Sequence, residues 1–275
     1  MSRLDEKTTG SSRNDQTYVI GSGWWCSQEP DSRVNPKRGK LGTNKQREVE
    51  FFQIWLNNIK NYTSPSSIAV VDSASPIKPD SELRAQTTWI ELPFNARHAT
   101  DHIGQWSGWL RSVLMSGQYA LATEADYFVY VEQDCLLKGE RIIDRCLEDM
   151  RTGLMFGDGE GTPQPLQQSF FLIGRARLGS FLKNLSDIKA RDSEISPEWK
   201  FVFASWRPFV LCANMGLLTR RKTRARVVRI ARRFFFDDLP MGVGRSRPVP
   251  FDATYYYFQH GSEEEITQHL EALYG

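Results

Sequence analysis

The chain has 275 residues, of which 40% are hydrophobic and 12% aromatic, enough to bury a large core in one domain. Charged residues make up 25%, and 35 Lys and Arg against 33 Asp and Glu leave a net charge of only +2. This balance excludes an intrinsically disordered chain and a protein coated with nucleic acid along its length. No stretch reaches the ~18–20 apolar residues of a membrane-spanning helix. The four cysteines form no CxxC pair, so we expect reduced thiols in a cytoplasmic protein.

Residues 1–16 are polar and show no hydrophobic periodicity, which predicts a flexible segment without the apolar core of a secretion signal. We expect residues 17–275 to form a single domain.

Strand and helix patterns alternate after residue 17. Short β-branched or aromatic runs predict strands at 18–20, 68–71, 89–92, 127–131 and 169–173. Apolar residues at three- and four-residue steps predict helices at 43–62, where Thr43 and Gln46 form a capping box, at 104–121 and at 139–150. Such alternation is typical of an α/β fold with a mostly parallel sheet and helices on both faces.

The pattern is less regular after residue 186. It predicts a helix from Pro197, an apolar stretch at 209–218, an arginine-rich helix at 220–233, a strand at 254–258 and a helix at 263–274. We interpret this part as an elaboration of the same domain.

Two predicted strands end in acidic residues. Asp72 follows the strand at 68–71, and Glu132 and Asp134 follow the strand at 127–131. The carboxyl ends of parallel strands meet at one edge of the sheet, where ligands bind. In an extended segment Glu132 and Asp134 point to one side and Gln133 to the other, so both carboxylates would suit Mg²⁺ or Mn²⁺ with nucleotide phosphates. Alternatively, these acids only cap loops or the next helix.

The segment Tyr127–Asp134, preceded by a glycine-bearing helix and by a strand ending in Val71-Asp72-Ser73, resembles the GT-A family of nucleotide-sugar glycosyltransferases. The resemblance covers about residues 17–175. It implies a GT-A-like, Rossmann-type domain in which residues 17–180 bind the nucleotide sugar and residues 181–275 form the acceptor side.

The resemblance also implies roles for individual residues. Asp72 would contact the nucleoside, and Glu132-Gln133-Asp134 would be the metal motif, with Asp134 as a direct ligand and Glu132 on the metal, the ribose or both. Many members supply a late histidine as a further ligand, which would be His260; otherwise His260 is a hydrogen-bonded loop residue.

Three arginines are candidates for binding the donor. Arg111 is the nearest match to an arginine that family members often carry in the helix before the motif strand. In the loop 242–248, small residues accompany Arg245 and Arg247, whose guanidinium groups suit phosphate oxygens; the alternative is a basic surface turn. Trp24 and Trp25 would border the ligand or fill the core.

An inverting transferase needs a carboxylate that removes the proton of the acceptor hydroxyl, whereas a retaining one does not. The acids in the C-terminal half offer five candidates: Asp192, Glu194, Glu198, Asp237 and Asp238. We select Glu198, because it stands beside Pro197 at a predicted helix start, where inverting members of the family place their base.

Residues 220–233 contain eight basic residues in fourteen and run into Phe234-Phe235-Phe236. This segment would suit an anionic membrane that holds a lipid-linked acceptor, or a nucleic acid. The alternative is a solvated helix face whose arginines pair with Asp237 and Asp238.

We therefore predict a transferase of hexosyl or deoxyhexosyl groups, dependent on Mn²⁺ or Mg²⁺, that moves a sugar from a nucleoside diphosphate to a hydroxyl of a glycan or lipid-linked glycan. Such an enzyme would be cytoplasmic, with peripheral membrane contact and no nucleic-acid partner.

Two alternatives remain. One is a nucleotidyltransferase on a related fold, although those enzymes usually carry a cationic, glycine-rich loop after the first strand, and Gly21-Ser22-Gly23-Trp24-Trp25 has no cation. The other is a non-enzymatic module that binds nucleic acid or membranes through Arg220–Arg233.

Overall fold

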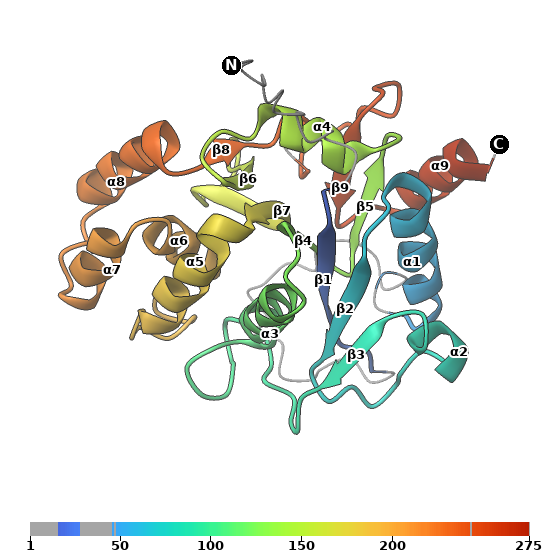
Figure 1. Cartoon of the computed structure of the whole chain (residues 1–275), viewed down its shortest axis with the longest axis horizontal. Coiled ribbons are helices and arrows are strands. Elements are labelled where there is room, and N and C mark those ends of the chain that lie inside the picture. Colours follow the sequence, from blue (N-terminus) through green and yellow to red (C-terminus); the bar gives the residue numbers. More distant parts are fainter. Residues whose placement is uncertain (1–15, 28–45, 47, 243, 275) are drawn as a thin grey trace, which may run out of the picture.

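A computed structural model describes residues 16–27, 46, 48–242 and 244–274 of the chain. The predicted flexible segment 1–16 lies outside them except for its last residue, and so does Thr43. The described residues form an α/β fold in which a seven-stranded sheet stands between two layers of helices (Figure 1).

The main sheet has the strand order β3-β2-β1-β4-β7-β6-β8. Its strands are β1 (Tyr18–Trp24), β2 (Ser67–Asp72), β3 (Thr88–Glu91), β4 (Tyr127–Val131), β6 (Leu154–Asp158), β7 (Leu166–Gly174) and β8 (Asp237–Asp238). Neighbouring strands are parallel except around β7, which is antiparallel to both β4 and β6. The predicted mostly parallel sheet is confirmed.

One face of the sheet is covered by α1 (Glu50–Tyr62), α4 (Ile142–Asp149), α9 (Glu263–Tyr274) and a two-stranded antiparallel sheet of β5 (Cys135–Lys138) and β9 (Tyr256–Gln259). The other face is covered by α3 (Gly108–Ala122), α5 (Arg175–Asp187), α6 (Pro197–Ala204), α7 (Arg207–Asn214) and α8 (Arg221–Phe234). The short α2 (Ser81–Arg84) precedes β3. The prediction of helices on both faces is therefore confirmed.

Strand β4 lies between the two helical layers. Val129 and Val131 belong to the core cluster on the α1 side, whereas Phe128 and Tyr130 belong to the cluster on the α3 side. Alternate residues of a strand point to opposite faces, so a strand buried on both faces must be apolar throughout, as β4 is.

The predicted helix at 43–62 begins later than its capping box indicated, at Glu50. Gln46 does not cap it; instead its side-chain Nε2 donates to the backbone oxygen of Asp134 at 3.5 Å. The predicted apolar face is confirmed, since Phe52, Leu56 and Ile59 are buried.

Helix α3 packs closely on β1. A Cβ atom on Gly21 would collide with Ser116 Oγ, and one on Gly23 would lie 2.9 Å from Ser112 Oγ. These glycines are thus part of the strand beneath the helix and not part of a loop after it.

Strands β8 and β9 come late in the chain but pair with β6 and β5. Residues 181–275 therefore share both sheets with residues 17–180. The assignment of donor binding to one half and acceptor binding to the other stays a prediction.

Candidate functional site

The carboxyl ends of β1, β2 and β4 meet at one edge of the main sheet, and β7 starts there because it runs antiparallel to β4, with Val131 opposite Phe170. We call this edge the rim. It contains Trp25, Asp72, residues 132–134 and residues 167–168.

The acidic motif after β4 is a turn. Cys135 N donates to Glu132 O at 2.9 Å, and Glu132 N donates to Ser169 O at 2.8 Å. The segment is therefore not extended as expected, and the alternation of a strand does not apply to it; that Glu132 and Asp134 face one side stays a prediction. Gln133 Oε1 accepts from Trp25 N at 2.9 Å, which joins the ends of β1 and β4.

Asp134 and His260 lie together at the rim. His260 Nε2 is 3.2 Å from Asp134 Oδ2, and the side chains of His260 and Asp134 are 18% and 17% exposed. The register of the small sheet explains this: Cys135 is opposite Gln259, so the residue before one and the residue after the other are neighbours. Asp134 Oδ1 is buried and has no hydrogen-bond partner in the described part of the chain.

Arg247 holds the backbone on which His260 stands. Its Nη2 donates to the carbonyl oxygens of Gln259 at 3.0 Å and His260 at 3.4 Å, its Nη1 donates to Ser246 O, and its Nε pairs with Glu265 at 2.5 Å. All of its guanidinium nitrogens thus have partners in the chain. Phosphate binding by Arg247 stays a prediction, while its observed contacts position His260, which has a left-handed φ of 57°.

Arg245 reaches the same corner. The buried side-chain amide of Gln259 lies between Ser169 and Arg245, and with its nitrogen toward Ser169 its oxygen accepts from Arg245 Nη2 at 2.8 Å. Because Ser169 also holds the motif turn through Glu132, Arg245 stands close to the Asp134–His260 pair.

Asp72 is fully buried at the end of β2. Its Oδ1 accepts from Ser75 N at 2.9 Å, so it caps the loop as the alternative interpretation expected. Its Oδ2 has no hydrogen-bond partner within the described residues but forms an ion pair of 3.6 Å with Lys78 Nζ, which also pairs with Glu91 at 2.7 Å. Contact of Asp72 with a nucleoside stays a prediction.

Arg111 contacts the loop before its own helix. Its Nε donates to Trp106 O at 3.1 Å and its Nη2 to Ile103 O at 3.3 Å, and its guanidinium carbon lies 5.1 Å from the centre of the Phe94 ring. Arg111 therefore braces the loop before α3. Donor binding by Arg111 stays a prediction.

Three of the alternative base candidates are used by the fold. Asp192 forms a fully buried ion pair with Lys200 at 2.6 Å and accepts from Ser107 N, and burial lowers the pKa of Lys200. Asp237 accepts from the backbone of residues 151–152, and Asp238 pairs with Arg232 at 2.9 Å. Burial raises the pKa of Asp238.

Glu198 lies in the first turn of α6 and is 9% exposed. Ser196 Oγ donates to Gln164 Oε1 at 3.1 Å, which attaches the start of α6 to the β6–β7 turn, and Asp192 attaches the preceding loop to the start of α3. Glu198 thus lies on the rim side of the sheet. No hydrogen bond or ion pair between described residues uses its carboxylate, whereas the exposed Glu194 accepts from Arg191 N.

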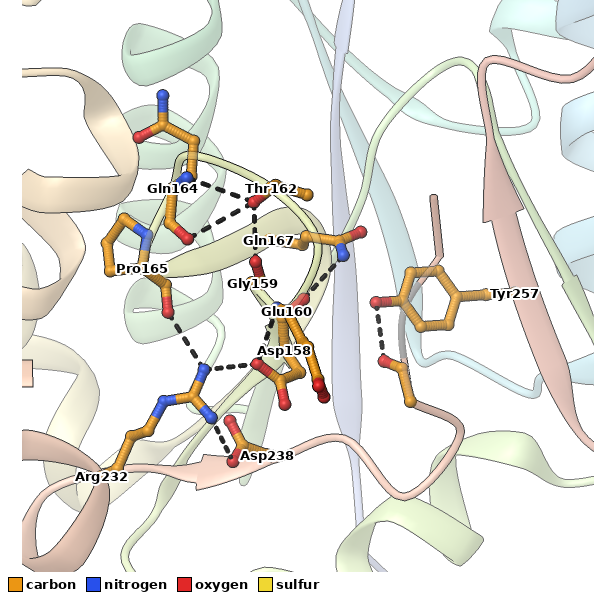
Figure 2. A network of polar contacts seen from close by, with 11 residues as sticks. Asp158, Gly159, Glu160, Thr162, Gln164, Pro165, Gln167, Arg232, Asp238 and Tyr257 are labelled. Carbon is orange, nitrogen blue, oxygen red and sulfur yellow. Dashed lines mark hydrogen bonds and ion pairs between the residues drawn. The ribbon is translucent and has the colours of Figure 1, made fainter. Parts of the chain in front are cut away.

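Several buried polar atoms at the rim have no partner in the described part of the chain. Of the twelve buried side-chain nitrogen and oxygen atoms without a hydrogen-bond partner within the described residues, five lie there: Trp25 Nε1, Asp72 Oδ2, Asp134 Oδ1, Gln167 Oε1 and Gln168 Oε1. Folded proteins rarely leave such atoms unpaired, so this edge is a candidate site for a polar ligand. The sequence reasoning missed both glutamines; polar residues at the start of an otherwise apolar strand were the available signal. Figure 2 shows Gln167, whose Nε2 donates to Asp158 O at 2.6 Å.

Asp134 and His260 together suit a cation whose remaining coordination positions are filled by a bound ligand. The described residues contain no group of three His, Cys, Asp or Glu placed to hold a metal, so Glu132 does not join Asp134 and His260 in one. Mg²⁺ is usually bound by one or two protein ligands together with water and substrate phosphates, and Mn²⁺ accepts mixed nitrogen and oxygen donors. The buried, unpaired Asp134 Oδ1 is consistent with such a cation.

The main sheet defines a mixed α/β protein, and the rim at the carboxyl ends of its strands is its candidate ligand site. No family model matches the sequence, and no curated protein matches it.

Solved structures with some likeness include the glycosyltransferase GlyE of Streptococcus pneumoniae, which has a TM-score of 0.39 and 8% identity and is aligned over 82% of this chain and 44% of that one. S. aureus TarS in complex with UDP has a TM-score of 0.37 and 12% identity, over 69% and 55%. A Leptospira borgpetersenii cytidylyltransferase has a TM-score of 0.39 and 11% identity, over 82% and 75%.

The chain spans about half the length of the first two glycosyltransferase structures, 44% and 55%. At these values the likeness decides neither activity nor substrate, which have to be argued from this chain's own residues. In the described part of the chain, no helix is long and apolar enough to cross a membrane.

Proposed function

We propose that the protein is a metal-dependent glycosyltransferase that moves a hexosyl or deoxyhexosyl group from a nucleoside diphosphate to a hydroxyl of a glycan or lipid-linked glycan. The observation that carries this proposal is the Asp134–His260 pair beside the carboxyl end of β4, with one carboxylate oxygen buried and unpaired among the described residues.

The rim residues divide the work of such a reaction. Asp134 and His260 hold the cation, Mn²⁺ or Mg²⁺, which when bound stabilises the negative charge that develops on the departing diphosphate. Asp72 receives the nucleoside, and Arg245 faces the diphosphate from the side of β9. Glu132 lies in the same turn and borders the ribose.

Glu198 serves as the base of an inverting reaction. A general base must be a carboxylate that the fold does not already use, within reach of the reacting hydroxyl. Glu198 meets the first condition, whereas Asp192, Asp237 and Asp238 do not. Its nearly buried position keeps bulk water from competing for the proton.

A nucleotidyltransferase would use the same carboxylates on a nucleoside triphosphate. The position of Gly21 and Gly23 favours the glycosyltransferase, because these glycines are covered by α3 inside β1 and so do not form a phosphate-binding loop.

Ligand-induced thermal stabilisation tests the proposal. Nucleoside diphosphates, nucleotide sugars and nucleoside triphosphates are each added with and without Mn²⁺ to the wild type and to Asp134→Asn. Asp149→Asn is the matched control, since Asp149 only pairs with Arg145 on the exposed side of α4. A ligand at a hundred times its dissociation constant should stabilise the fold by about 2.7 kcal/mol, a shift of several degrees.

We expect a nucleotide sugar to stabilise the wild type and the control only with Mn²⁺, and not Asp134→Asn. Equal stabilisation of Asp134→Asn would contradict the proposed metal site. Stabilisation by a triphosphate alone would favour the nucleotidyltransferase.

Glu198→Gln tests the base separately. We expect donor binding to persist while kcat falls by about 10²- to 10⁴-fold. Glu194→Gln, with its exposed carboxylate, should keep its turnover. If Glu198→Gln also keeps its turnover, the reaction does not use Glu198 as its base.

A further inference from the structure

The segment from residue 199 to residue 236 is free of acidic residues. No Asp or Glu occurs between Glu198 and Asp237, whereas this stretch contains ten Lys and Arg. The chain as a whole carries a charge of only +2, so its positive charge is concentrated in this segment.

Four of the ten basic side chains form ion pairs or hydrogen bonds within the protein. Lys200 pairs with Asp192, Arg207 pairs with Asp187, and Arg224 donates to Leu218 O. The fourth is Arg232, which Figure 2 shows between Asp158, Asp238 and the carbonyl of Pro165. Its guanidinium lowers the pKa of Asp158.

The other six basic side chains are exposed and have no acidic partner in the described part of the chain: Arg220, Arg221, Lys222, Arg226, Arg229 and Arg233. The pairing with Asp237 and Asp238 that the solvated-face alternative expected occurs, among the described residues, only between Arg232 and Asp238. Asp237 instead accepts from Thr152 and pairs with Arg151.

Large apolar side chains are exposed in the same segment. Nine such side chains are exposed among the described residues, and six of them belong here, with exposures of 42–71%: Trp206, Leu211, Met215, Leu217, Ile230 and Phe234. Most of the exposed large apolar side chains thus belong to one segment, which makes this segment a candidate interaction surface.

Helical spacing brings the charges together. Lys222, Arg226 and Arg229 with Arg233 lie three and four residues apart on the outer side of α8, while Val227 and Ala231 are buried against the core. Met215 and Leu217 lie in the connection from α7 to α8. Figure 1 shows α7 and α8 at the end of the molecule opposite α9. We call the six exposed apolar and six exposed basic side chains the α7–α8 face.

We propose that the α7–α8 face binds an anionic membrane surface, with Met215 and Leu217 entering the boundary between headgroups and acyl chains and the basic side chains contacting lipid phosphates. Helices that lie in this interface combine basic and apolar side chains in this way. The phosphates of a nucleic-acid backbone would pair with the basic side chains, but they provide no apolar environment for the exposed Met215 and Leu217. A second copy of the face would bring six unpaired cations against six more. This binding does not depend on the proposed function.

Cosedimentation with vesicles tests the charge. The full-length protein is mixed with vesicles of phosphatidylcholine alone and with vesicles of equal parts phosphatidylcholine and phosphatidylglycerol. We expect binding only to the anionic vesicles, and a roughly 30-fold weaker binding of the double variant Arg226→Gln/Arg229→Gln, from the loss of two basic side chains near the surface. Arg175→Gln/Lys183→Gln, two exposed basic residues of α5, is the matched control and should bind as the wild type does.

The apolar contribution separates a membrane from other polyanions. Met215→Ser/Leu217→Ser should weaken vesicle binding by roughly tenfold or more, while Met115→Ser, an exposed methionine of α3, should not. Unchanged thermal midpoints of the variants would show that they are folded.

Three outcomes overturn the proposal. The first is no sedimentation with anionic vesicles, and the second is equal sedimentation of the face variants and their controls. The third is a loss that affects only the charge variant and occurs equally with a single-stranded oligonucleotide, which would assign the face to nucleic acid. In the case of the first outcome, a dimer in solution would assign the face to a second copy.

Discussion

The two ends of strand β9 differ in how completely their polar atoms are paired. At the Tyr256 end, Tyr256, His269 of α9, Asn58 of α1 and the backbone of Leu137 in β5 form a buried junction in which every polar side-chain group has a partner. At the other end His260 faces Asp134, whose Oδ1 is buried and unpaired within the described chain.

The bonds of the junction fix the tautomer of His269. Asn58 Oδ1 accepts from Leu137 N, so its Nδ2 faces both Leu137 O at 2.8 Å and His269 Nε2 at 2.9 Å. Nε2 must therefore accept, and Nδ1–H donates to the Tyr256 hydroxyl at 3.0 Å. The ring is neutral, and burial followed by the nearby charge of Lys138 lowers its pKa to about 4. The end whose polar groups are all paired anchors the strand, whereas the His260 end carries the proposed metal site.

Of the changes that distinguish the two ends of β9, we expect Asn58→Ala to have the largest effect, a loss of folding stability. This change leaves the Leu137 amide and carbonyl and His269 Nε2 unpaired in the core, at a cost of about 4 kcal/mol, or a fall in Tm of roughly 10 °C. Thermal unfolding measures it, and Asn57→Ala on the exposed side of α1 is the control. If the two variants melt together, the junction does not anchor β9.

The pH dependence of stability should be the next largest effect. Folded His269 stays neutral down to about pH 4, whereas the unfolded ring, with an ordinary pKa near 6.5, takes up a proton below about pH 6.5. The contribution of neutral His269 to stability is therefore fully present above about pH 6.5. It is lost as the pH falls toward 4, by about 3 kcal/mol. Urea unfolding at a series of pH values gives the free energy of unfolding at each pH. Between about pH 6.5 and 4 this free energy should fall more steeply for the wild type than for His269→Gln, and an equal fall in both would refute the assignment.

His260→Ala should act on the site and spare the fold. We expect Mn²⁺ to bind about 100-fold more weakly in the presence of a nucleoside diphosphate, with little change in Tm because the side chain is partly exposed and ends the strand. Calorimetric titration gives the affinity. His98→Ala, in the loop before α3, is the control, and a loss of equal size there would show that His260 has no special role.

The smallest effect is expected from Arg247→Gln. Because Arg247 holds the carbonyl oxygens of Gln259 and His260, its loss should weaken Mn²⁺ binding by roughly tenfold without removing a ligand. Glu265→Gln, which releases the Arg247 side chain, should reproduce part of this loss. If donor binding without metal falls instead, Arg247 contacts phosphate directly.

Local patterns predicted much of the sheet. The runs that became β1, β2 and β4 are apolar because both faces of these strands are covered, and such runs can be recognised without knowing their neighbours. The arginine-rich helix at 220–233 was also predicted and is observed as α8. By contrast, the patterns did not indicate β5, β6 or β8, which are only two to five residues long.

Contacts between distant residues were not predictable. Asp192 and Asp237 looked like free acids, and their partners include Ser107 and Arg151, each about 85 residues away in the chain. The turn at Glu132–Cys135 depends on a hydrogen bond to β7. His260 was chosen for its place late in the chain, but its position opposite Asp134 follows from the pairing of β5 with β9, which no single segment encodes.

Gly21 and Gly23 of β1 let α3 pack closely on the sheet through Ser116 and Ser112. The first turn of α3 lies beside the end of β2, where a Cβ on Gly108 would come within 3.0 Å of Ser73 Oγ. The position of this first turn relative to the rim depends on the contacts that later residues of α3, Ser112 and Ser116, make with Gly23 and Gly21 of β1. A methyl group at Gly21 would collide with Ser116 of α3 and with the Phe128 ring, and so would disturb this packing although every residue of the proposed site would be unchanged.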